Sequence, residues 1–270
     1  MPISVVIHTY NASRYLQRVL DSVKDFDEII ICDMESTDST LDIARSMGCR
    51  ILSVPKKNYT IPEPYRDYAI HSASYEWVLV VDADELVTPG LKDFLYDHIS
   101  KPDAEPGVRI PRMNYVFNQF QSSTYPDYQL RFMFRDKAHW PNRIHSLPDV
   151  DGEVLTIPSG RKDLAFRHLQ SNMRDQITRM NYYTDNELAR RRTKKASLWR
   201  LWLEPKFRFF KSYVMKGGFR NGTSGYILAK RGAFYRYALL SKLFEEQEGA
   251  HQGLNDSACD DADKLNLLNK

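Results

Sequence analysis

The sequence predicts an α/β fold with a mostly parallel central sheet, followed by a helical C-terminal appendage. Three observations predict this arrangement. Short apolar runs alternate with helical patterns in the N-terminal part of the chain, as in parallel sheets joined by helical crossovers. Polar and acidic residues directly follow several of these runs, at what would be the carboxyl edge of the sheet. From Ser171 onward the apolar residues recur at helical spacing instead.

The predicted strands and helices can be placed in order along the chain. Apolar runs predict strands at residues 4–9, 28–33, 51–54 and 77–81. Helical spacing of apolar residues begins at Leu16, and Gly48 stops a second helix. Pro64 opens a third helix. This alternation implies right-handed crossovers and a crevice at the carboxyl ends of the strands.

Polar residues stand at three of the predicted strand ends. Thr9 ends the first strand, Asp33 ends the second, and the fourth runs into Asp82-Ala83-Asp84-Glu85. Carboxylates at this edge can hold a hard divalent cation, and this edge is where open α/β sheets bind nucleotides. Neither a Gly-x-Gly-x-x-Gly nor a Gly-Lys-Ser/Thr phosphate loop occurs. The phosphates of a nucleotide would therefore be held by a metal ion and a basic residue such as Arg66.

The composition indicates a globular protein. The 270 residues are 42% hydrophobic, and no apolar run approaches the ~20 residues needed to cross a bilayer. No basic region precedes the first apolar stretch, so no signal peptide is predicted and we expect the protein in the cytosol. The cysteines have no metal-ligand spacing and an odd count, which fits a reducing compartment.

A second half of the same domain is predicted from residue 106 to residue 170. A helix is predicted at residues 91–99, and further strands at 108–112, 114–117 and 129–134. Between the last two strands, the loop at 122–127 returns towards the predicted crevice and carries Asp127.

Several motifs resemble, in order and spacing, those of the family 2 glycosyltransferases, which have the GT-A fold. They are Ser4-Val5-Val6-Ile7-His8-Thr9-Tyr10-Asn11, Asp33, Ser36-Thr37-Asp38-Ser39-Thr40, Arg66 and Asp82-Ala83-Asp84-Glu85. Three later stretches resemble the bacterial subgroup that adds sugars to lipopolysaccharide core or related surface glycans. They are Tyr125-Pro126-Asp127-Tyr128-Gln129-Leu130-Arg131-Phe132-Met133-Phe134-Arg135, Arg143-Ile144-His145 and Lys195-Ala196-Ser197-Leu198-Trp199-Arg200. The resemblance extends to about Phe244.

The resemblance implies an inverting, metal-dependent transfer of a hexose from a UDP-sugar to a lipopolysaccharide-core or other lipid-linked glycan acceptor. The residues that it implies for nucleotide-sugar binding are Thr9, Tyr10, Asn11, Asp33, Glu35, Arg66, Asp82 and Ala83. Arg66 would face the pyrophosphate, and Asp84 would coordinate Mg²⁺ or Mn²⁺ between the donor phosphates. The alternative for each residue is a structural cap at a strand end.

An inverting sugar transfer also needs a base that takes the proton of the acceptor hydroxyl, a step worth ~10²–10⁴ in rate. Asp127 is the candidate, and a turn aspartate after Pro126 is the alternative. His145 could complete the metal shell or contact phosphate, and His168 is the second choice for this role. A lone histidine is more often structural.

Two other classes of protein remain open at this point. One is a nucleotidyl- or phosphoryl-transferring enzyme that uses the same acids. The other is a non-catalytic basic adaptor for membranes or nucleic acid, whose sheet is only a scaffold.

The C-terminal segment at 171–244 is basic, aromatic and helical in pattern. Between Arg190 and Lys242 the sequence has many basic residues interleaved with aromatic residues. Glu204 is the one acidic residue in this segment. Helices of this kind lie in the interface of anionic membranes, which predicts a peripheral protein on the inner face of the cytoplasmic membrane. A packed appendage with a solvated basic face is the alternative. No nucleic-acid reader motif accompanies the charge, so no nucleic acid is expected.

The chain is thus predicted to have four parts. They are a nucleotide-sugar-binding half (1–105), an acceptor and catalytic half (106–170), the basic helical segment (171–244) and a polar tail (245–270).

Overall fold

A computed structural model describes residues 1–57, 63–141, 148–169, 173–191 and 195–248. The chain divides into two compact units. Unit 1 comprises Met1–Phe120 and Thr124–Gln170, and unit 2 comprises Gln121–Ser123 and Ser171–Lys270.

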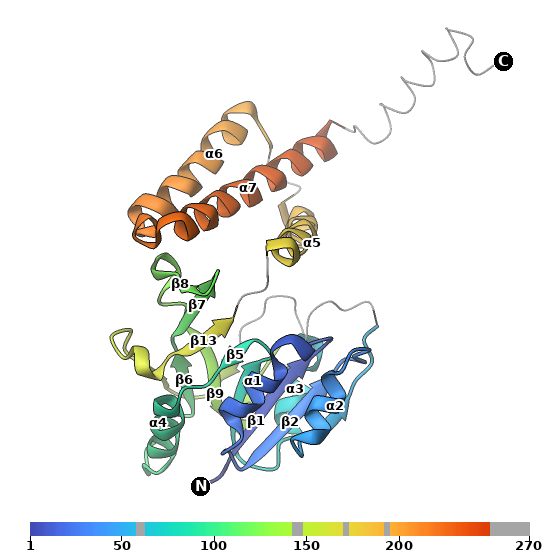
Figure 1. Cartoon of the computed structure of the whole chain (residues 1–270), viewed down its shortest axis with the longest axis vertical. Helices are drawn as coiled ribbons and strands as arrows, with labels where there is room; N and C mark the ends of the chain where they lie inside the picture. The colour runs from blue at the N-terminus through green and yellow to red at the C-terminus, as the bar shows by residue number, and fades with distance from the viewer. Residues whose placement is uncertain (58–62, 142–147, 170–172, 192–194, 249–270) are drawn as a thin grey trace, which may run out of the picture. The chain divides into compact units, whose positions relative to one another are not determined.

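Unit 1 holds the sheets and the first four helices, as labelled in Figure 1. Its α-helices are α1 (Ser13–Val23), α2 (Thr40–Ser46), α3 (Glu63–His71) and α4 (Pro89–Ile99). Its strands are β1 (Ile3–Thr9), β2 (Glu28–Asp33), β3 (Arg50–Ser53), β4 (Trp77–Asp82), β5 (Glu85–Leu86), β6 (Gly107–Ile110), β7 (Arg112–Val116), β8 (Gln119–Phe120), β9 (Gln129–Phe134), β10 (Ala138–His139), β11 (Asp149–Val150), β12 (Val154–Thr156) and β13 (Phe166–Leu169). Short 3₁₀ helices are η1 (Ser122–Thr124), which spans the boundary of the units, η2 (Arg135–Lys137) and η3 (Lys162–Leu164).

The main sheet has seven strands in the order β12-β6-β9-β4-β1-β2-β3. Strands β4, β1, β2 and β3 run parallel, whereas β9 lies antiparallel between β4 and β6. The predicted α/β fold with a mostly parallel sheet is confirmed. In the parallel register Thr9 pairs with Asp33 and His8 pairs with Asp82, so the ends of three strands meet at one edge.

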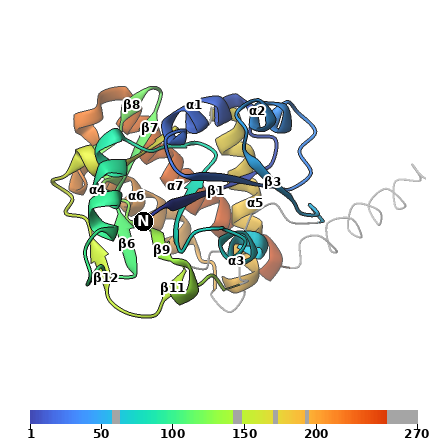
Figure 2. The ribbon, with the colours of Figure 1, turned by 90° about the horizontal axis from the view of Figure 1, so that it is seen from below.

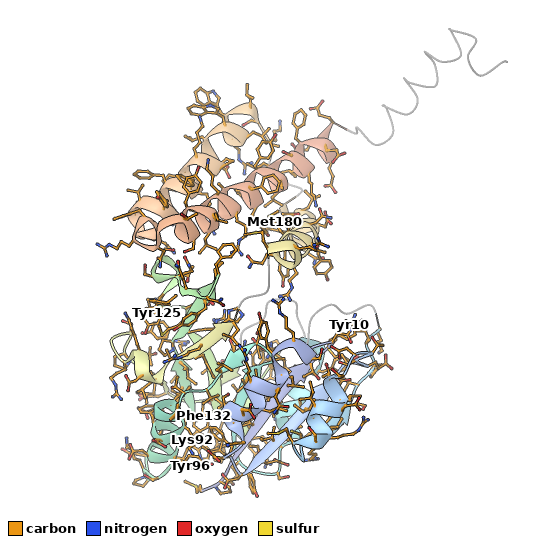
Figure 3. The ribbon with its side chains drawn as sticks, viewed as in Figure 1. Tyr10, Lys92, Tyr96, Tyr125, Phe132 and Met180 are labelled. Carbon is orange, nitrogen blue, oxygen red and sulfur yellow. The ribbon has the colours of Figure 1, made fainter. Side chains whose placement is uncertain are left out.

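Helices cover both faces of this sheet because alternate residues of each strand point to opposite faces. Along β1, Val5 and Ile7 pack in a cluster with α1, α2 and α4, whereas Val6 packs in a second cluster with α3. Figure 2 shows α1 and α2 on one side of β1 and β3, and α3 on the other. Phe132 of β9 is fully buried in the first cluster, whereas Tyr10 lies at the surface of the unit (Figure 3).

A second sheet, in the order β5-β13-β7-β8, brings distant parts of the sequence to the same edge. Strand β5 follows the acidic turn at the end of β4. Strand β13 pairs with it on one side and with β7 on the other, placing His168 opposite both Glu85 and Asn114. The alternation of side chains along β7 then puts Arg112 and Asn114 on one face.

Unit 2 is helical. It contains α5 (Met173–Arg191), α6 (Leu198–Phe210), the π-helical turn η4 (Lys211–Met215), the 3₁₀ helix η5 (Gly218–Asn221) and α7 (Gly222–Gln247). Helix α7 packs against both α5 and α6, with a small core in which Leu188, Leu239 and Leu243 are buried. The predicted C-terminal helices are confirmed.

Two details of this segment differ from the prediction. The stripe predicted on α5 is only partly buried, because Met180 lies inside whereas Ile177 is half exposed. Helix α7 also continues to Gln247, and most of the predicted tail lies outside the described residues. Within the described part of the chain, no helix is long and apolar enough to span a membrane.

Candidate functional site

The loops after β1 and β2 are tied together by one hydrogen-bond network. Asp33 accepts hydrogen bonds from the hydroxyls of Thr9 (2.7 Å) and Ser36 (2.6 Å) and from the backbone amide of Ser36 (2.8 Å). Asn11 Oδ1 accepts from the backbone amide of Thr37 at 2.8 Å. Thr9 and Asp33 are almost fully buried, so in this structure their polar groups stabilise the conformation of the loops after β1 and β2. Their role in nucleotide-sugar binding stays a prediction.

Two residues of these loops have a left-handed backbone conformation. Asn11 has a φ of 48° and Glu35 a φ of 59°, a region that is costly for a residue such as glutamate. The carboxylate of Glu35 accepts a hydrogen bond from the backbone amide of Lys56, whose ammonium lies over the exposed ring of Tyr10. Strained backbone of this kind gathers at functional sites. The binding roles of Tyr10 and Glu35 stay predictions.

The acidic side chains of the turn after β4 point in different directions. Asp82 accepts from Arg66 Nη2 at 2.8 Å and from Arg131 Nη2 at 2.7 Å, so each of its oxygens faces a guanidinium group. Burial alone would raise the pKa of Asp82, but Arg131 and Arg66 hold it well below its usual range. Ala83 packs partly buried against the core.

Glu85, the last acid of the turn, is fully buried and links the turn to the predicted base. It accepts from the backbone amide of Asp82 at 3.1 Å and from Arg112 Nη1 at 2.8 Å. The same guanidinium donates through Nε and Nη2 to Asp127 Oδ2, at 2.9 and 2.7 Å. Burial of Arg112 opposes its charge, yet the carboxylates of Glu85 and Asp127 raise its pKa above the usual range. Asp127 is thereby held in one orientation.

Asp84 faces a histidine from the second sheet. Its Oδ2 atom lies 3.4 Å from His168 Nε2, and His168 Nδ1 lies 2.7 Å from Asn114 Oδ1. The amide nitrogen of Asn114 donates to Asp127 Oδ2 at 3.1 Å, so the amide oxygen is the acceptor that faces His168. Burial lowers the pKa of His168, but its contact with Asp84 outweighs this and raises the pKa overall.

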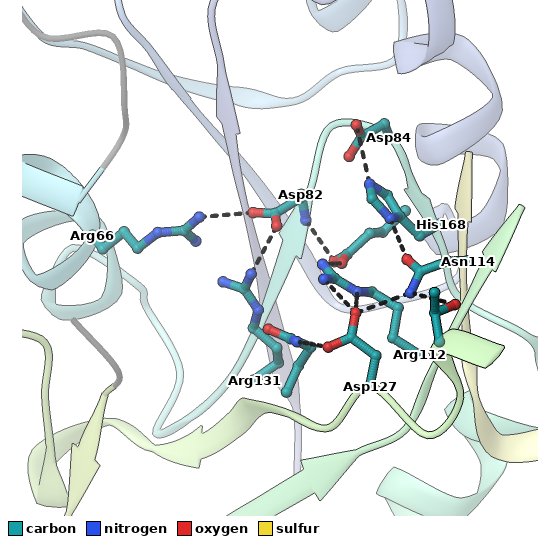
Figure 4. A network of polar contacts seen from close by, with 11 residues as sticks. Arg66, Asp82, Asp84, Arg112, Asn114, Asp127, Arg131 and His168 are labelled. Carbon is teal, nitrogen blue, oxygen red and sulfur yellow. Dashed lines mark hydrogen bonds and ion pairs between the residues drawn. The ribbon is translucent and has the colours of Figure 1, made fainter. Parts of the chain in front are cut away.

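These contacts form a continuous polar network from Arg66 to Asp84, drawn in Figure 4. It brings together four residues predicted from the sequence, Arg66, Asp82, Asp84 and Asp127, with His168, the second choice for a metal ligand. His145, the first choice, lies outside the described residues.

Reasoning from the sequence missed three members of this network, which are Arg112, Asn114 and Arg131. Two signals could have found them. Arg112 ends one predicted strand and Asn114 begins the next, whereas the structure has both on β7, and reading the two stretches as one strand would have placed them on one face. Arg131 stands within an otherwise apolar run, where a buried charge needs a partner.

The family of the chain follows from a comparison of the sequence with known families. The model described as glycosyl transferase family 2 matches residues 4–153, which is more than half of the chain. The chain belongs to this family. It is therefore a glycosyltransferase with the GT-A fold, which decides between the classes left open by the sequence. The parallel strands β1 to β4 lie within the matched range except for Ile3, and so does the acidic turn.

Similar glycosyltransferases come from several bacteria. The lipopolysaccharide core biosynthesis glycosyltransferase LpsC of Rhizobium meliloti is 26% identical, over 91% of this chain and 93% of its own. An uncharacterized glycosyltransferase of Rickettsia conorii, RC0292, is 26% identical over 90% of each chain. Among solved structures, residues 1–349 of S. aureus TarS give a TM-score of 0.46 at 17% identity, covering 92% of each chain.

The residues of this glycosyltransferase fit a divalent cation between Asp84 and His168. One carboxylate oxygen and one imidazole nitrogen face each other, and the Asn114 contact is the kind that orients a metal-binding histidine. Two ligands of one octahedral cation, with bonds of ~2.1 Å, lie about 3 Å apart. No third His, Cys, Asp or Glu joins them among the described residues. Mg²⁺ and Mn²⁺ sites of this type take their other oxygens from substrate phosphates and water.

Proposed function

We propose that this enzyme transfers a hexose from a UDP-sugar to a lipopolysaccharide-core type of acceptor, with inversion at the anomeric carbon and with a divalent cation. The observation that supports the proposal is the network from Arg66 to Asp84, in which guanidinium groups, the Asp84–His168 contact and a fixed carboxylate converge at the carboxyl edge of the sheet. Membership in family 2 supports the sugar transfer.

In this proposal the diphosphate of the donor lies between Arg66, at one end of the network, and the Asp84–His168 pair at the other. Asp84 and His168 would hold Mg²⁺ or Mn²⁺, which supplies positive charge to the leaving diphosphate. Arg66 would face the same diphosphate from α3. Thr9, Tyr10, Asn11, Asp33 and Glu35 shape the loops that bind the base and ribose.

Asp127 is the proposed general base. Its Oδ2 atom is occupied by three donors from Arg112 and Asn114, whereas Oδ1 accepts a single hydrogen bond among the described residues, from Gln129 Nε2 at 3.0 Å. Oδ1 therefore has a lone pair available, and the side chain is about one-third exposed (31%). As the acceptor oxygen attacks the anomeric carbon, its proton passes to Oδ1 and the bond to the diphosphate oxygen breaks. A single displacement of this kind inverts the anomeric centre.

The acceptor class rests on the likeness to LpsC, a lipopolysaccharide core biosynthesis enzyme. Such an acceptor is anchored in a membrane. We therefore propose that the enzyme works in the cytoplasm, bound peripherally to the inner face of the cytoplasmic membrane. The exposed aromatic and basic side chains of α6 and α7 support this placement.

Calorimetry and a donor panel test the proposal. UDP should bind the full-length protein with an affinity that rises when Mn²⁺ or Mg²⁺ is added, and one UDP-sugar of a panel should be hydrolysed slowly in the absence of acceptor. That sugar should then be transferred to a truncated lipopolysaccharide core in vesicles, and the anomeric configuration of the product should be opposite to that of the donor. Absence of UDP binding, or retention of configuration, contradicts the proposal.

A further inference from the structure

Two guanidinium groups lie side by side in the interior of unit 1, next to Asp82. Arg66 of α3 is 5% exposed and Arg131 of β9 is 6% exposed, and they share the single carboxylate of Asp82. The ring of Trp140 lies against both, with its centroid 4.6 Å from Cζ of Arg66 and 5.4 Å from Cζ of Arg131. This buried group therefore carries two positive charges and one negative charge.

Most hydrogen-bond donors of this group are unused. Each guanidinium reaches Asp82 through Nη2 alone. The buried atoms without a hydrogen-bond partner among the described residues include Nε and Nη1 of Arg66, Nε and Nη1 of Arg131, Nε1 of Trp140 and both ring nitrogens of His8. Burial and the charges of Arg66 and Arg131 lower the pKa of His8 to about 3, so its ring adds no charge at pH 7.

Buried donors normally find an acceptor, because an unpaired donor loses its hydration without compensation. A buried positive charge without a counter-charge is costlier still. Among the described residues, Asp82 is the carboxylate with which both guanidinium groups pair, and their remaining buried nitrogens have no hydrogen-bond partner. An oxygen-rich anion would satisfy both the donors and the surplus charge.

We propose that Arg131 and Trp140 complete the diphosphate subsite with Arg66, and that Asp82 is the positioning residue that orients the two guanidinium groups. This inference rests on the proposed function and extends it. A phosphate presents several oxygens to which a guanidinium group can donate in pairs, and it restores the charge balance. The cluster opens at Asp82, whose side chain is 26% exposed, and Asp82 stands two residues before Asp84 of the metal-ligand pair.

The role of Asp82 follows from its contacts. Both of its oxygens already accept from a guanidinium group, at 2.8 and 2.7 Å, so it holds the arginines apart at fixed positions. The alternative reading of the cluster is a structural one, in which ordered water fills the space and the arginines only stabilise the fold.

The two readings predict opposite effects on stability. Substitution of Arg131 by methionine leaves Arg66 and Asp82 as a one-to-one pair, so it removes surplus charge from the free protein. If the cluster serves a ligand, the unliganded Arg131→Met protein should melt at or above the temperature of the wild type while its affinity for diphosphate falls. If Arg131 is structural, the melting temperature falls and the affinity stays.

The test titrates uridine, UMP, UDP and inorganic pyrophosphate into the full-length wild type and its variants. Arg131→Met should weaken UDP and pyrophosphate binding by about tenfold or more, the usual effect of losing a hydrogen bond to a charged group, and leave uridine binding within about twofold. Trp140→Phe keeps the ring and removes only the Nε1 donor, so it should weaken UDP binding several-fold in a folded protein. Arg161→Met, at an exposed arginine of the same unit, is the matched control and should bind as the wild type does.

UDP and pyrophosphate affinities of Arg131→Met and Trp140→Phe that match the wild type would overturn the inference and leave the proposed function standing. Failure of the wild type to bind UDP would instead overturn the proposed function. Pyrophosphate binding then still decides between the two interpretations of the cluster. An anion site is supported if the wild type binds pyrophosphate and Arg131→Met does not. It is refuted if the wild type does not bind pyrophosphate.

Discussion

His168 presents Nε2 to Oδ2 of Asp84 at 3.4 Å, while its Nδ1 atom faces Asn114 Oδ1 at 2.7 Å. Because the amide oxygen of Asn114 can only accept, Nδ1 carries a hydrogen. Nε2 then faces the carboxylate either protonated, which the raised pKa of His168 favours, or with a lone pair directed at a bound cation. Two acceptors face each other stably only when a proton or a cation lies between them. Asp84 and His168 are therefore the ligands that we propose for the divalent cation.

Removal of either candidate ligand should abolish metal binding and turnover together. We expect Asp84→Asn and His168→Gln to retain less than about a tenth of the wild-type rate, a loss of at least ~1.4 kcal/mol of transition-state stabilisation. Mn²⁺ binding, measured by electron paramagnetic resonance with and without UDP, checks the cause. His71→Gln, at a half-exposed histidine of α3, is the control. A comparison with His145→Gln shows which histidine holds the cation, and full Mn²⁺ affinity in His168→Gln would assign that role to His145.

Asn114 should act on the metal without touching it. Its side chain is buried, and it fixes the ring of His168 on one side and Asp127 on the other. Asn114→Ala is expected to lower Mn²⁺ affinity by about 10–100-fold, as the loss of such an outer contact commonly does. Differential scanning calorimetry separates this effect from a loss of fold. A lower melting temperature with unchanged Mn²⁺ affinity would mean that Asn114 is only structural.

Asp127→Asn tests the proposed base. The amide keeps the shape of the side chain but cannot take the proton of the acceptor, so turnover should fall by ~10²-fold or more. UDP affinity should stay within a few fold, because the change acts on the acceptor side. A collapse of UDP binding would assign Asp127 to the donor site. If neither quantity changes, the base lies elsewhere, and Asp149, Asp151 and His145 are the next residues to substitute.

The fold and the acidic turn could be predicted from the sequence because both depend on local patterns. Apolar runs with both faces buried mark the parallel strands, and polar residues at their carboxyl ends mark the crevice. The register of β1 with β2 and β4 confirms that Thr9, Asp33 and Asp82 end neighbouring strands at one edge.

The partners of each acid could not be predicted, because they come from strands far away in the sequence. The three acids of the turn look equivalent in the sequence. In the structure, Asp82 pairs with Arg66 and Arg131, and Glu85 pairs with Arg112. Only Asp84 faces His168, and this depends on the pairing of β13 with β5, which no local pattern encodes. Long-range strand pairing therefore decides which of the three acids contacts the histidine.

The last prediction concerns the surface of unit 2. Helix α6 exposes a stripe of large apolar residues at helical spacing, made of Trp199, Trp202, Leu203, Phe207 and Phe210. Within this stripe Lys206 Nζ lies 3.5 Å from the centroid of the Trp202 ring. Glu204 instead forms ion pairs with Arg200 and Arg236. Rings and a long cationic side chain on one face suit the interface of an anionic membrane, where each Lys or Arg adds ~1 kcal/mol that salt screens.

We expect the wild type to sediment with vesicles that contain anionic lipid much better than with neutral ones, and to be released only partly by high salt. The triple variant Trp199→Ser, Trp202→Ser and Phe207→Ser should lose the salt-resistant part, because the rings supply it. Ile177→Ser, at a half-exposed residue of α5, should bind as the wild type does. Because the proposed acceptor is membrane-anchored, the triple variant should also lose more transfer to acceptor in vesicles than slow donor hydrolysis in solution. Unchanged vesicle binding, combined with loss of a dimer in analytical ultracentrifugation, would instead show that the α6 stripe joins two copies of the chain.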